Sequence, residues 1–369
     1  MAPENAANNL QRLHALGQSA WLDYVSRGLL ESGELARMVE SGWIRGVTSN
    51  PTIFLKAITS ANDYDTALGA LRGEGVTDPY EAFLALASAD LRAAADALRE
   101  VYESAAGRDG FISFEAQEGS AAAIVAEARR VFGLLDRPNV MIKVPGTAAG
   151  IEALPTLIAE GINVNITLLF AIEVYEKVAL AYIDGLEQRR QRGLSIERVA
   201  SVASFFVSRV DTKADALLPD GSPLRGRVAV ANARLAYQRF QEIFAGPRWQ
   251  ALAAAGAQLQ RPLWASTGTK NAAYSDTLYV DDLVAADTVN TMPEATLLAF
   301  LDHGRPELSI EAGIADAAEV RRQAAAAGVD LDVLGRELLA EGLTSFGNDF
   351  AQLLGQIEKK LTAAPRSVS

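Results

Sequence analysis

A single lysine interrupts an otherwise apolar and β-branched segment, and it is the residue of this chain best suited to covalent chemistry. Lys143 lies in the segment NVMIKVPGT, directly between Ile142 and Val144, and no other of the seven lysines has such apolar neighbours within a predicted strand. An amine made neutral by burial can form a Schiff base with a carbonyl substrate, whereas a guanidinium keeps its proton. The alternative is a buried ion pair with Glu115 or Asp23.

Schiff-base chemistry moves protons at several steps, so proton carriers must lie near the amine. The chain has no cysteine and only two histidines, His14 and His303, which we expect at the surface. Carboxylates and hydroxyls therefore remain for this task. The candidates are Glu115, Asp23 and a water molecule held by Thr167. A paired core carboxylate for Glu115 and a strand-end cap for Asp23 are the structural alternatives.

The overall composition argues against several other classes of function. The absence of cysteine excludes disulfides, thiolate catalysis and Cys-ligated metals, and two histidines are too few for a His-rich zinc site. The net charge is −12 with no basic stripe, which argues against a nucleic-acid-binding protein. No apolar run reaches the roughly 18 to 20 residues that span a bilayer, and the N-terminus MAPENAANNL lacks the regions of a secretory signal. We therefore expect a cytoplasmic protein.

Eight short β-like runs alternate with longer helical stretches along the chain. Strands that alternate with helices predict parallel βα units. Eight units within about 300 residues favour a closed (β/α)8 TIM barrel over an open doubly wound sheet, and no GxGxxG or P-loop motif follows the first strand. The predicted strands are 20–25, 44–50, 110–116, 139–145, 162–169, 202–209, 262–269 and 286–292.

Two helical regions exceed the regular barrel pattern. A helical excursion of about 51–109 separates the second and third predicted strands, and a C-terminal helical segment of about 310–361 follows the eighth. The sequence shows no internal repeat, low-complexity linker or break in composition. We therefore expect residues 1–369 to form a single α/β barrel domain with extra helices.

The alternation of side chains along each strand predicts which residues point into the barrel. In INVNITLL the residues Asn163, Asn165 and Thr167 are polar, while the residues between them are apolar. A half-exposed strand would show the same pattern, but the outer face of a barrel is covered by helices and must be apolar. The same test, applied to six strands, gathers polar side chains near the C-terminal mouth, where barrel enzymes keep their chemistry: Lys143, Glu115, Asp23, Thr48, Asn50, Asn165, Thr167 and Ser204.

Several of these residues are candidates for binding a substrate. The amides of Asn50 and Asn165 could hold substrate hydroxyls, although barrel-core amides bonded to one another would give the same pattern. Thr48 and Ser204 join them on polar strand faces. A second group follows the sixth and seventh strands, near where barrels often bind phosphate, and each of its members could also be a solvated loop residue: Arg209, Ser266 and Lys270.

Four motifs give the chain a resemblance to a known family. The motifs are GVTSNPTIF, NVMIKVPGT, GINVNITLLF and SRVDT, and in this order they resemble the longer bacterial type of transaldolase. The resemblance runs from Trp21 to about Phe300. It implies a class I aldolase-type barrel that moves a dihydroxyacetone unit from sedoheptulose 7-phosphate to glyceraldehyde 3-phosphate. The products would be erythrose 4-phosphate and fructose 6-phosphate, in the pentose phosphate pathway, and no cofactor or metal is implied.

The resemblance also implies roles for individual residues. Lys143 matches the Schiff-base lysine, Glu115 the carboxylate that works through a catalytic water, and Thr167 the residue that holds this water. Asp23 matches the carboxylate that takes the hydroxyl proton during C–C cleavage, and Asn50 the amide that positions the substrate.

Phosphate-binding positions are matched by Arg209 and Ser266, and more weakly by Lys270 because its loop differs from the family pattern. The segment FEAQEG after the third predicted strand also departs from the expected Glu-Val-x-Pro continuation, although Glu115 itself is in place. The implied partners are sugar phosphates, with a monomer or small homo-oligomer as the expected assembly.

Two rival functions remain open. A lyase that cleaves fructose 6-phosphate and releases free dihydroxyacetone would share the lysine and the barrel, but the related aldolases are much shorter and lack a glutamate at the position of Glu115. A non-catalytic sugar-phosphate-binding barrel would be expected to have lost part of the catalytic set. Here the lysine, both carboxylates and the threonine are all present.

Overall fold

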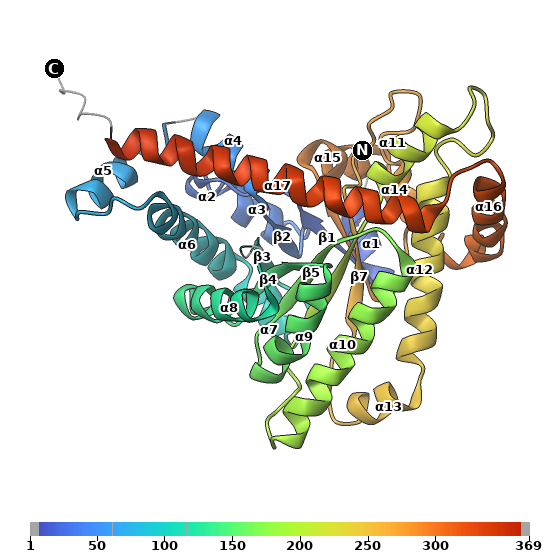
Figure 1. Ribbon diagram of the computed structural model, residues 1–369, viewed down its shortest axis with the longest axis horizontal. Coiled ribbons are helices and arrows are strands. Elements are labelled where there is room, and N and C mark those ends of the chain that lie inside the picture. Colours follow the sequence, from blue (N-terminus) through green and yellow to red (C-terminus); the bar gives the residue numbers. More distant parts are fainter. Residues whose placement is uncertain (1–6, 61, 116, 118, 363–369) are drawn as a thin grey trace.

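Eight parallel strands close into a barrel in which each strand pairs with the next in sequence, and β8 pairs with β1 (Figure 1). This computed structural model describes residues 7–60, 62–115, 117 and 119–362. The predicted (β/α)8 TIM barrel is therefore confirmed. The strands are β1 (Gln18–Leu22), β2 (Gly46–Thr48), β3 (Phe111–Glu115), β4 (Val140–Pro145), β5 (Val164–Leu169), β6 (Ser201–Phe206), β7 (Gln260–Ala265) and β8 (Thr288–Met292).

Helices surround the barrel, with additional helices before β3 and after β8. The first group is α1 (Asn9–Ala15), α2 (Arg27–Glu31), α3 (Glu34–Glu40), α4 (Pro51–Ser60), α5 (Asp65–Gly73), α6 (Pro79–Ala97), α7 (Arg99–Ser104) and α8 (Ala121–Leu135). The second group is α9 (Ala148–Glu160), α10 (Ile172–Gln191), α11 (Ser208–Leu217), α12 (Val228–Phe244), α13 (Pro247–Ala253), α14 (Leu278–Asp281), α15 (Glu294–His303), α16 (Ile314–Ala326) and α17 (Leu331–Thr362), with a short 3-10 turn at Glu311–Gly313. Within the described ranges, no helix has the length and apolar character needed to cross a bilayer.

Several predicted strands extend too far towards their carboxyl ends. The first strand ends at Leu22, so Asp23 lies just beyond it, although its N–H still donates to the Met292 carbonyl at 2.8 Å. Asn50 lies beyond β2, and Arg209 lies in the first turn of α11 rather than at the end of a strand. Asp and Asn favour loops and helix starts, where their side-chain oxygens can accept hydrogen bonds from backbone N–H groups, as Asn50 does from Ile53.

The register of β3, β4 and β5 aligns three polar side chains. Glu115 pairs with Lys143, and Lys143 pairs with Asn165. The intervening residues Ile142 and Val144 are fully buried, as expected for side chains that pack against the surrounding helices. Alternation along these strands thus gives the barrel a polar inner face and an apolar outer face. The apolar core lies mainly between the strands and the helices.

The excursion between β2 and β3 consists of four helices, α4 to α7. The loop after β3, where the sequence departs from the expected family pattern, falls partly on residues 116 and 118, which lie outside the described residues. The N-terminal segment considered as a secretory signal is likewise outside them over residues 1–6.

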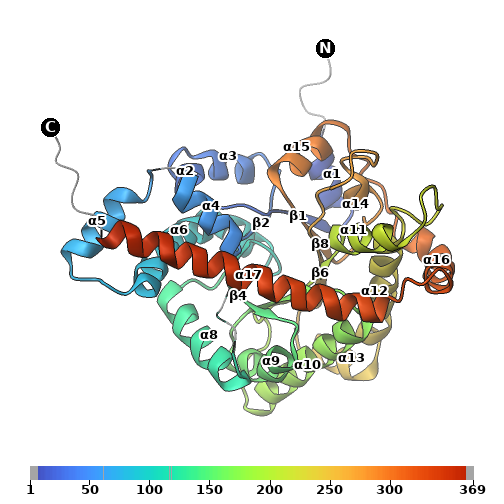
Figure 2. The same ribbon diagram turned by 45° about the horizontal axis from the view of Figure 1, so that its top comes forward.

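The 32-residue helix α17 crosses the C-terminal mouth of the barrel. Figures 1 and 2 show it as the long helix that lies over the strands and reaches from the side of α12 and α16 to α5. Two glycines permit this close approach. A Cβ atom on Gly335 would lie 3.1 Å from Ala171 Cβ, and one on Gly342 would lie 2.9 Å from Leu168 Cδ2, both just at or after the end of β5.

The two histidines occupy different environments. His303 is exposed and forms ion pairs with Asp276 and Asp302, which raise the pKa of its imidazole. The prediction that His14 is a surface residue was wrong. It is half-buried and accepts a hydrogen bond from the backbone N–H of Ala20 at 3.2 Å, and burial together with the charge of Arg45 lowers its pKa to about 4. It lies near the start of β1, away from the mouth of the barrel.

Candidate active site

Lys143 is buried at the mouth of the barrel, with only 5% of its surface exposed. Its Nζ atom lies 2.9 Å from Glu115 Oε2 and donates a hydrogen bond to the Ser49 carbonyl at 3.0 Å. The buried ion pair considered from the sequence is thus present, and its partner is Glu115. An amine and a carboxylate in direct contact form a pair that can exchange a proton without large movement.

Thr167 follows on the neighbouring strand, in register with Pro145 at the end of β4. Its side chain is fully buried, and among the described residues its Oγ1 atom has no hydrogen-bond partner; Glu115 Oε2 also lacks a well-aligned hydrogen bond. A buried hydroxyl without a protein partner is suited to bind a small polar molecule.

The backbone changes direction directly after Thr167. The register between β5 and β6 shifts between Ile166 and Leu169, and Leu168 adopts φ of +59°. A bulky residue in the left-handed region costs about 1–3 kcal/mol, so packing must hold it there. Alternation predicts that Leu168 points outward, but the structure places its side chain against α17 at Gly342. This bulge ends the regular alternation at the threonine.

Asp23 occupies the opposite side of the mouth. Thr48 Oγ1 donates to Asp23 Oδ1 at 2.6 Å and also lies 2.6 Å from Thr291 Oγ1. Burial raises the pKa of the Asp23 carboxyl, while the Thr48 hydrogen bond and the charges of Lys143, Lys270 and Arg209 act in the opposite direction. A carboxyl with a raised pKa accepts a proton more readily than an ordinary aspartate does.

Asn50 caps the helix that follows β2. Its Oδ1 atom accepts a hydrogen bond from the Ile53 N–H at 3.0 Å, in the manner of an N-cap for α4. Asn50 also lines a cavity beside Glu115. Since the oxygen is engaged by the backbone, its amide nitrogen is the group that remains for a substrate.

Asn165 and Ser204 belong to a hydrogen-bonded row inside the barrel. Asn165 Nδ2 donates to Ser113 Oγ at 3.1 Å, and Ser204 Oγ donates to Asn165 Oδ1 at 2.6 Å. All three side chains are buried. The row is thus internally bonded, which fits the alternative that polar groups in the barrel core bond to one another. These bonds also fix the orientation of the Asn165 amide next to Lys143.

Arg209 projects from the first turn of α11 and is partly buried. Its Cζ atom lies 5.5 Å from the ring centroid of Phe206 and 5.9 Å from that of Phe346 in α17. Burial lowers the pKa of its guanidinium, and the charges of Glu341, Asp23 and Asp349 oppose this effect. A guanidinium between aromatic faces and short of water is suited to bind an anion.

The helix that carries Arg209 is anchored by a buried carboxyl. Asp211 accepts hydrogen bonds from the Ala229 N–H at 2.7 Å and from the Tyr279 hydroxyl at 2.9 Å. Burial raises the pKa of Asp211 to about 7. The SRVDT motif therefore supplies both the cation and the residue that fixes its helix to α12 and α14.

Ser266 follows β7 and adopts φ of +56°. Its Oγ atom lies 2.9 Å from Ser208 Oγ, and its carbonyl accepts a hydrogen bond from the Ser208 N–H at 3.0 Å. This contact joins the loop after β7 to the start of α11, one residue before Arg209. Lys270, farther along the loop, is exposed and acts on Asp23 through its charge.

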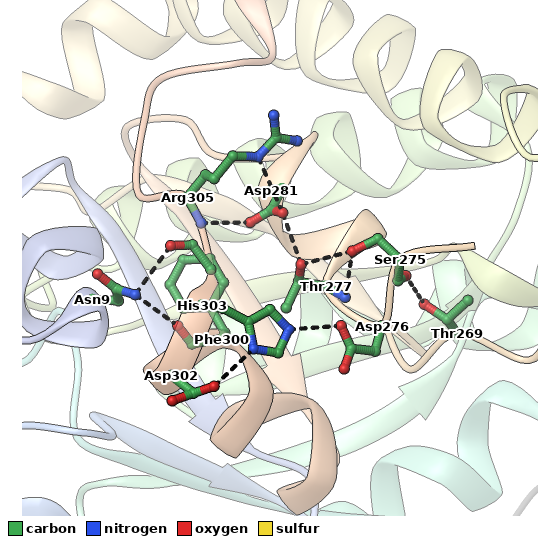
Figure 3. A network of polar contacts seen from close by, with 11 residues as sticks. Asn9, Thr269, Ser275, Asp276, Thr277, Asp281, Phe300, Asp302, His303 and Arg305 are labelled. Carbon is green, nitrogen blue, oxygen red and sulfur yellow. Dashed lines mark hydrogen bonds and ion pairs between the residues drawn. The ribbon is translucent and has the colours of Figure 1, made fainter. Parts of the chain in front are cut away.

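A polar network holds the far side of this loop (Figure 3). Thr269 Oγ1 donates to the Ser275 carbonyl at 2.9 Å, and Thr277 Oγ1 donates to Asp281 Oδ2 at 2.8 Å. Asp281 also accepts from the N–H of Arg305 at 2.8 Å. The loop bearing Ser266 and Lys270 is therefore tied to α14 and to the segment after α15.

Beside Glu115 lies a cavity of about 320 Å³ with mainly aromatic walls. Its aromatic residues come from α4, α6, β3 and α17 and are Phe54, Tyr80, Phe83, Phe114, Phe346 and Phe350. Sequence reasoning did not select Phe346 or the Ser49 carbonyl. Phe346 lies 203 positions after Lys143, and no local pattern marks a residue that joins a site through a distant helix. In the part of the chain that the structure describes, no group of three or more His, Asp or Glu residues is placed to hold a metal ion.

The sequence of this chain is similar to one family model and to several named proteins along nearly its whole length. The family model described as transaldolase/fructose-6-phosphate aldolase matches residues 20–357. A protein named transaldolase from Frankia alni is 47% identical, covering 96% of this chain and 98% of its own length. Transaldolase 1 from Streptomyces coelicolor is 48% identical, covering 96% and 95%. Transaldolase 2 from a Nostoc species is 43% identical, covering 96% and 98%.

Proposed function

Since this chain belongs to the transaldolase/fructose-6-phosphate aldolase family, we propose how its own residues carry out the transfer of a dihydroxyacetone unit. The protein is a transferase of the transaldolase type. It converts sedoheptulose 7-phosphate and glyceraldehyde 3-phosphate into erythrose 4-phosphate and fructose 6-phosphate, a step of the pentose phosphate pathway. The observation that carries the assignment of residues is the buried Lys143 amine in contact with Glu115.

The first half of the reaction forms the Schiff base. Lys143 Nζ attacks the ketone carbon of the donor, and the resulting carbinolamine loses its hydroxyl as water. Glu115 supplies and removes the protons through a water molecule held by Thr167 Oγ1. The 2.9 Å contact between the amine and Glu115, and the buried Thr167 hydroxyl without a protein partner among the described residues, support these roles.

The second half cleaves and reforms a carbon–carbon bond. Asp23 takes the proton of the donor hydroxyl adjacent to the breaking bond, so that an aldose leaves and the electron pair remains as an enamine on Lys143. The enamine then attacks the acceptor aldehyde, and the new alkoxide takes the proton back from Asp23. Water adds to the resulting Schiff base, the C–N bond breaks, and the product ketose and the free Lys143 amine are released. The raised pKa of the Asp23 carboxyl favours its part as a temporary proton holder.

The remaining polar residues hold the substrate along this path. We assign the substrate hydroxyls to Asn50, Thr48, Asn165 and Ser204, and the phosphate to Arg209, Ser266 and Lys270. Local charge supports the second assignment, because Arg209 and Lys270 both act on Asp23 at the mouth although the whole chain has a net charge of −12. The reaction needs no cofactor or metal.

The phosphate assignment predicts a specific effect of Arg209→Ala. We expect the KM for fructose 6-phosphate to rise about ten- to hundredfold, with a smaller change in kcat, because a charge-assisted contact to the phosphate is lost. Steady-state kinetics with fructose 6-phosphate and with unphosphorylated fructose measure the difference. The exposed Arg336 is a matched control, and Arg336→Ala should leave both constants unchanged. An equal loss with both sugars would argue against a phosphate contact.

Transfer and simple cleavage are separated by the need for an acceptor. With fructose 6-phosphate as donor, we expect rapid turnover in the presence of erythrose 4-phosphate and very little release of free dihydroxyacetone without it. Chromatographic detection of sedoheptulose 7-phosphate and dihydroxyacetone checks both reactions. Comparable turnover without an acceptor would instead assign the chain to the fructose-6-phosphate aldolase branch of its family.

The setting of the reaction is part of the proposal. We place the enzyme in the cytoplasm and expect a monomer or small homo-oligomer that binds no nucleic acid. The acidic composition and the absence of cysteine support this setting. A non-catalytic sugar-phosphate-binding barrel is disfavoured because the lysine, both carboxylates and the threonine are retained.

A further inference from the structure

Phe346 brings an aromatic ring from the C-terminal helix close to Lys143 and to Arg209. Its ring centroid lies 6.0 Å from Lys143 Nζ and 5.9 Å from Arg209 Cζ. The side chain is buried, with 7% of its surface exposed. In the proposed function the substrate chain extends from its ketone carbon at Lys143 to its phosphate at Arg209, so the ring borders the path between them.

Phe346 also lines the cavity beside Lys143, with its ring 6.0 Å from the Nζ atom. The ring and Glu115 both line the aromatic cavity, whereas Lys143 is not among the residues that line it. Removing the ring would extend the cavity towards the Nζ atom. The cavity would then give water a shorter route to the amine and to any adduct formed on it.

The position of the ring is fixed by contacts on both sides of α17. Towards α11, Lys213 forms ion pairs with Glu337 and Glu341 at 2.7 and 2.6 Å. Towards α4, Thr52 donates to Asp349. The close approach at Gly342, one turn before the phenylalanine, brings the helix onto the end of β5. The ring is therefore held over the site by a helix that is attached at several points.

A transferase that forms a covalent adduct must protect it from water until the acceptor arrives. After the aldose leaves, the enamine on Lys143 can take a proton on carbon and become an iminium ion. Water then adds to the iminium carbon, the C–N bond breaks, and free dihydroxyacetone and the lysine amine are released. This route needs only water and a proton, and it is suppressed when water other than the molecule assigned to Thr167 is kept away from the adduct.

We propose that Phe346 is a positioning residue that shields the dihydroxyacetone adduct on Lys143 from water and thereby favours transfer over hydrolysis. This inference rests on the proposed function, since it concerns the fate of the adduct in that reaction. The ring acts through its bulk and apolar surface and contributes no proton or covalent bond. It makes α17 part of the active site rather than only an outer cover.

The test is the ratio of hydrolysis to transfer. Free dihydroxyacetone is measured with fructose 6-phosphate alone, and sedoheptulose 7-phosphate is measured after addition of erythrose 4-phosphate. Phe346→Ala should raise the ratio about tenfold or more relative to the unmodified enzyme, because water reaches the adduct more easily. Phe346→Leu keeps an apolar group of similar reach and should restore most of the selectivity. If the alanine variant does not fold, Phe346→Val, which also removes the reach of the ring, takes its place, and a ratio equal to that of the unmodified enzyme then overturns the proposal.

Leu353→Ala is the matched control. Leu353 is a fully buried residue of the same helix and does not line the cavity, so its truncation should lower the melting temperature without changing the ratio. An unchanged ratio in Phe346→Ala, or an equal rise in Leu353→Ala, would refute a specific role of the ring. Failure of the proposed function looks different, because the unmodified enzyme would then give no acceptor-dependent transfer at all.

Discussion

Lys143→Ala should lower kcat by about four orders of magnitude and abolish covalent labelling by the substrate. Borohydride reduces a Schiff base to a stable secondary amine. With fructose 6-phosphate, the unmodified enzyme should therefore gain one substrate-derived mass on the peptide that contains Lys143. Mass spectrometry of the reduced protein measures the adduct, and coupled kinetics measure the turnover.

The expected loss follows from the surroundings of the amine. Among the described residues Lys143 is the only buried lysine, and Lys270 at the mouth is exposed, so neither Lys270 nor a surface lysine such as Lys213 is placed to replace the lost nucleophile. Lys143→Arg should be equally inactive, because a guanidinium does not form the required imine. The exposed Lys177 serves as the control, and Lys177→Ala should remain active and labelled. An unmodified wild-type protein after reduction would exclude the Schiff-base mechanism.

Glu115→Gln should lower turnover by about 10²- to 10⁴-fold, the range expected for loss of general acid–base catalysis. The amide keeps the shape of the carboxylate but cannot carry the proton that Schiff-base formation, dehydration and release require. Formation of the trapped adduct should fall less than turnover, because adduct formation involves fewer proton transfers than the complete cycle. Single-turnover trapping and steady-state kinetics on the same preparation compare the two effects.

Because Glu115 forms an ion pair with Lys143, the effect of Glu115→Gln on stability must be separated from its effect on catalysis. If Glu115 were only a structural partner, Glu115→Gln would lower the melting temperature while the folded fraction kept its turnover. Thermal unfolding therefore accompanies the kinetic measurement. Glu100 is exposed on α7, and Glu100→Gln is expected to leave both quantities unchanged. Unchanged turnover in Glu115→Gln would remove this carboxylate from the mechanism.

The barrel could be predicted because its signals are local. Apolar residues at alternate positions, such as Ile142 and Val144, report the helix-facing side of a strand, and the polar residues between them then face the interior. For β3, β4 and β5 this rule is sufficient to group Glu115, Lys143 and Asn165, which the structure pairs in register. Strand ends were less predictable, since polar residues such as Asp23 fit either an inward strand position or a loop.

Other features depend on tertiary contacts that leave no periodic signal. The left-handed conformation of Leu168 reverses the direction of its side chain, so alternation fails at that residue. Packing against Gly342 of α17 accompanies this conformation, and the two residues are far apart in the sequence. His14 is similar, because its surroundings include Asp109 and Arg261, which come from distant parts of the chain. Local sequence patterns cannot report such partners.

The order of the elements along the chain matters during synthesis on the ribosome. The barrel closes only after β8 has been made, because β1 pairs with β8, and the helix that brings Phe346 to Lys143 is made later still. At about 5–20 residues per second, the stretch from Met292 to Thr362 takes on the order of several seconds to translate. A nascent chain arrested between β8 and α17 should thus present the lysine without its cover, and borohydride trapping on stalled ribosomes would reveal whether such a chain already consumes sugar phosphate. Each molecule would then react with the donor before α17 is complete, and would transfer efficiently only after α17 covers the site.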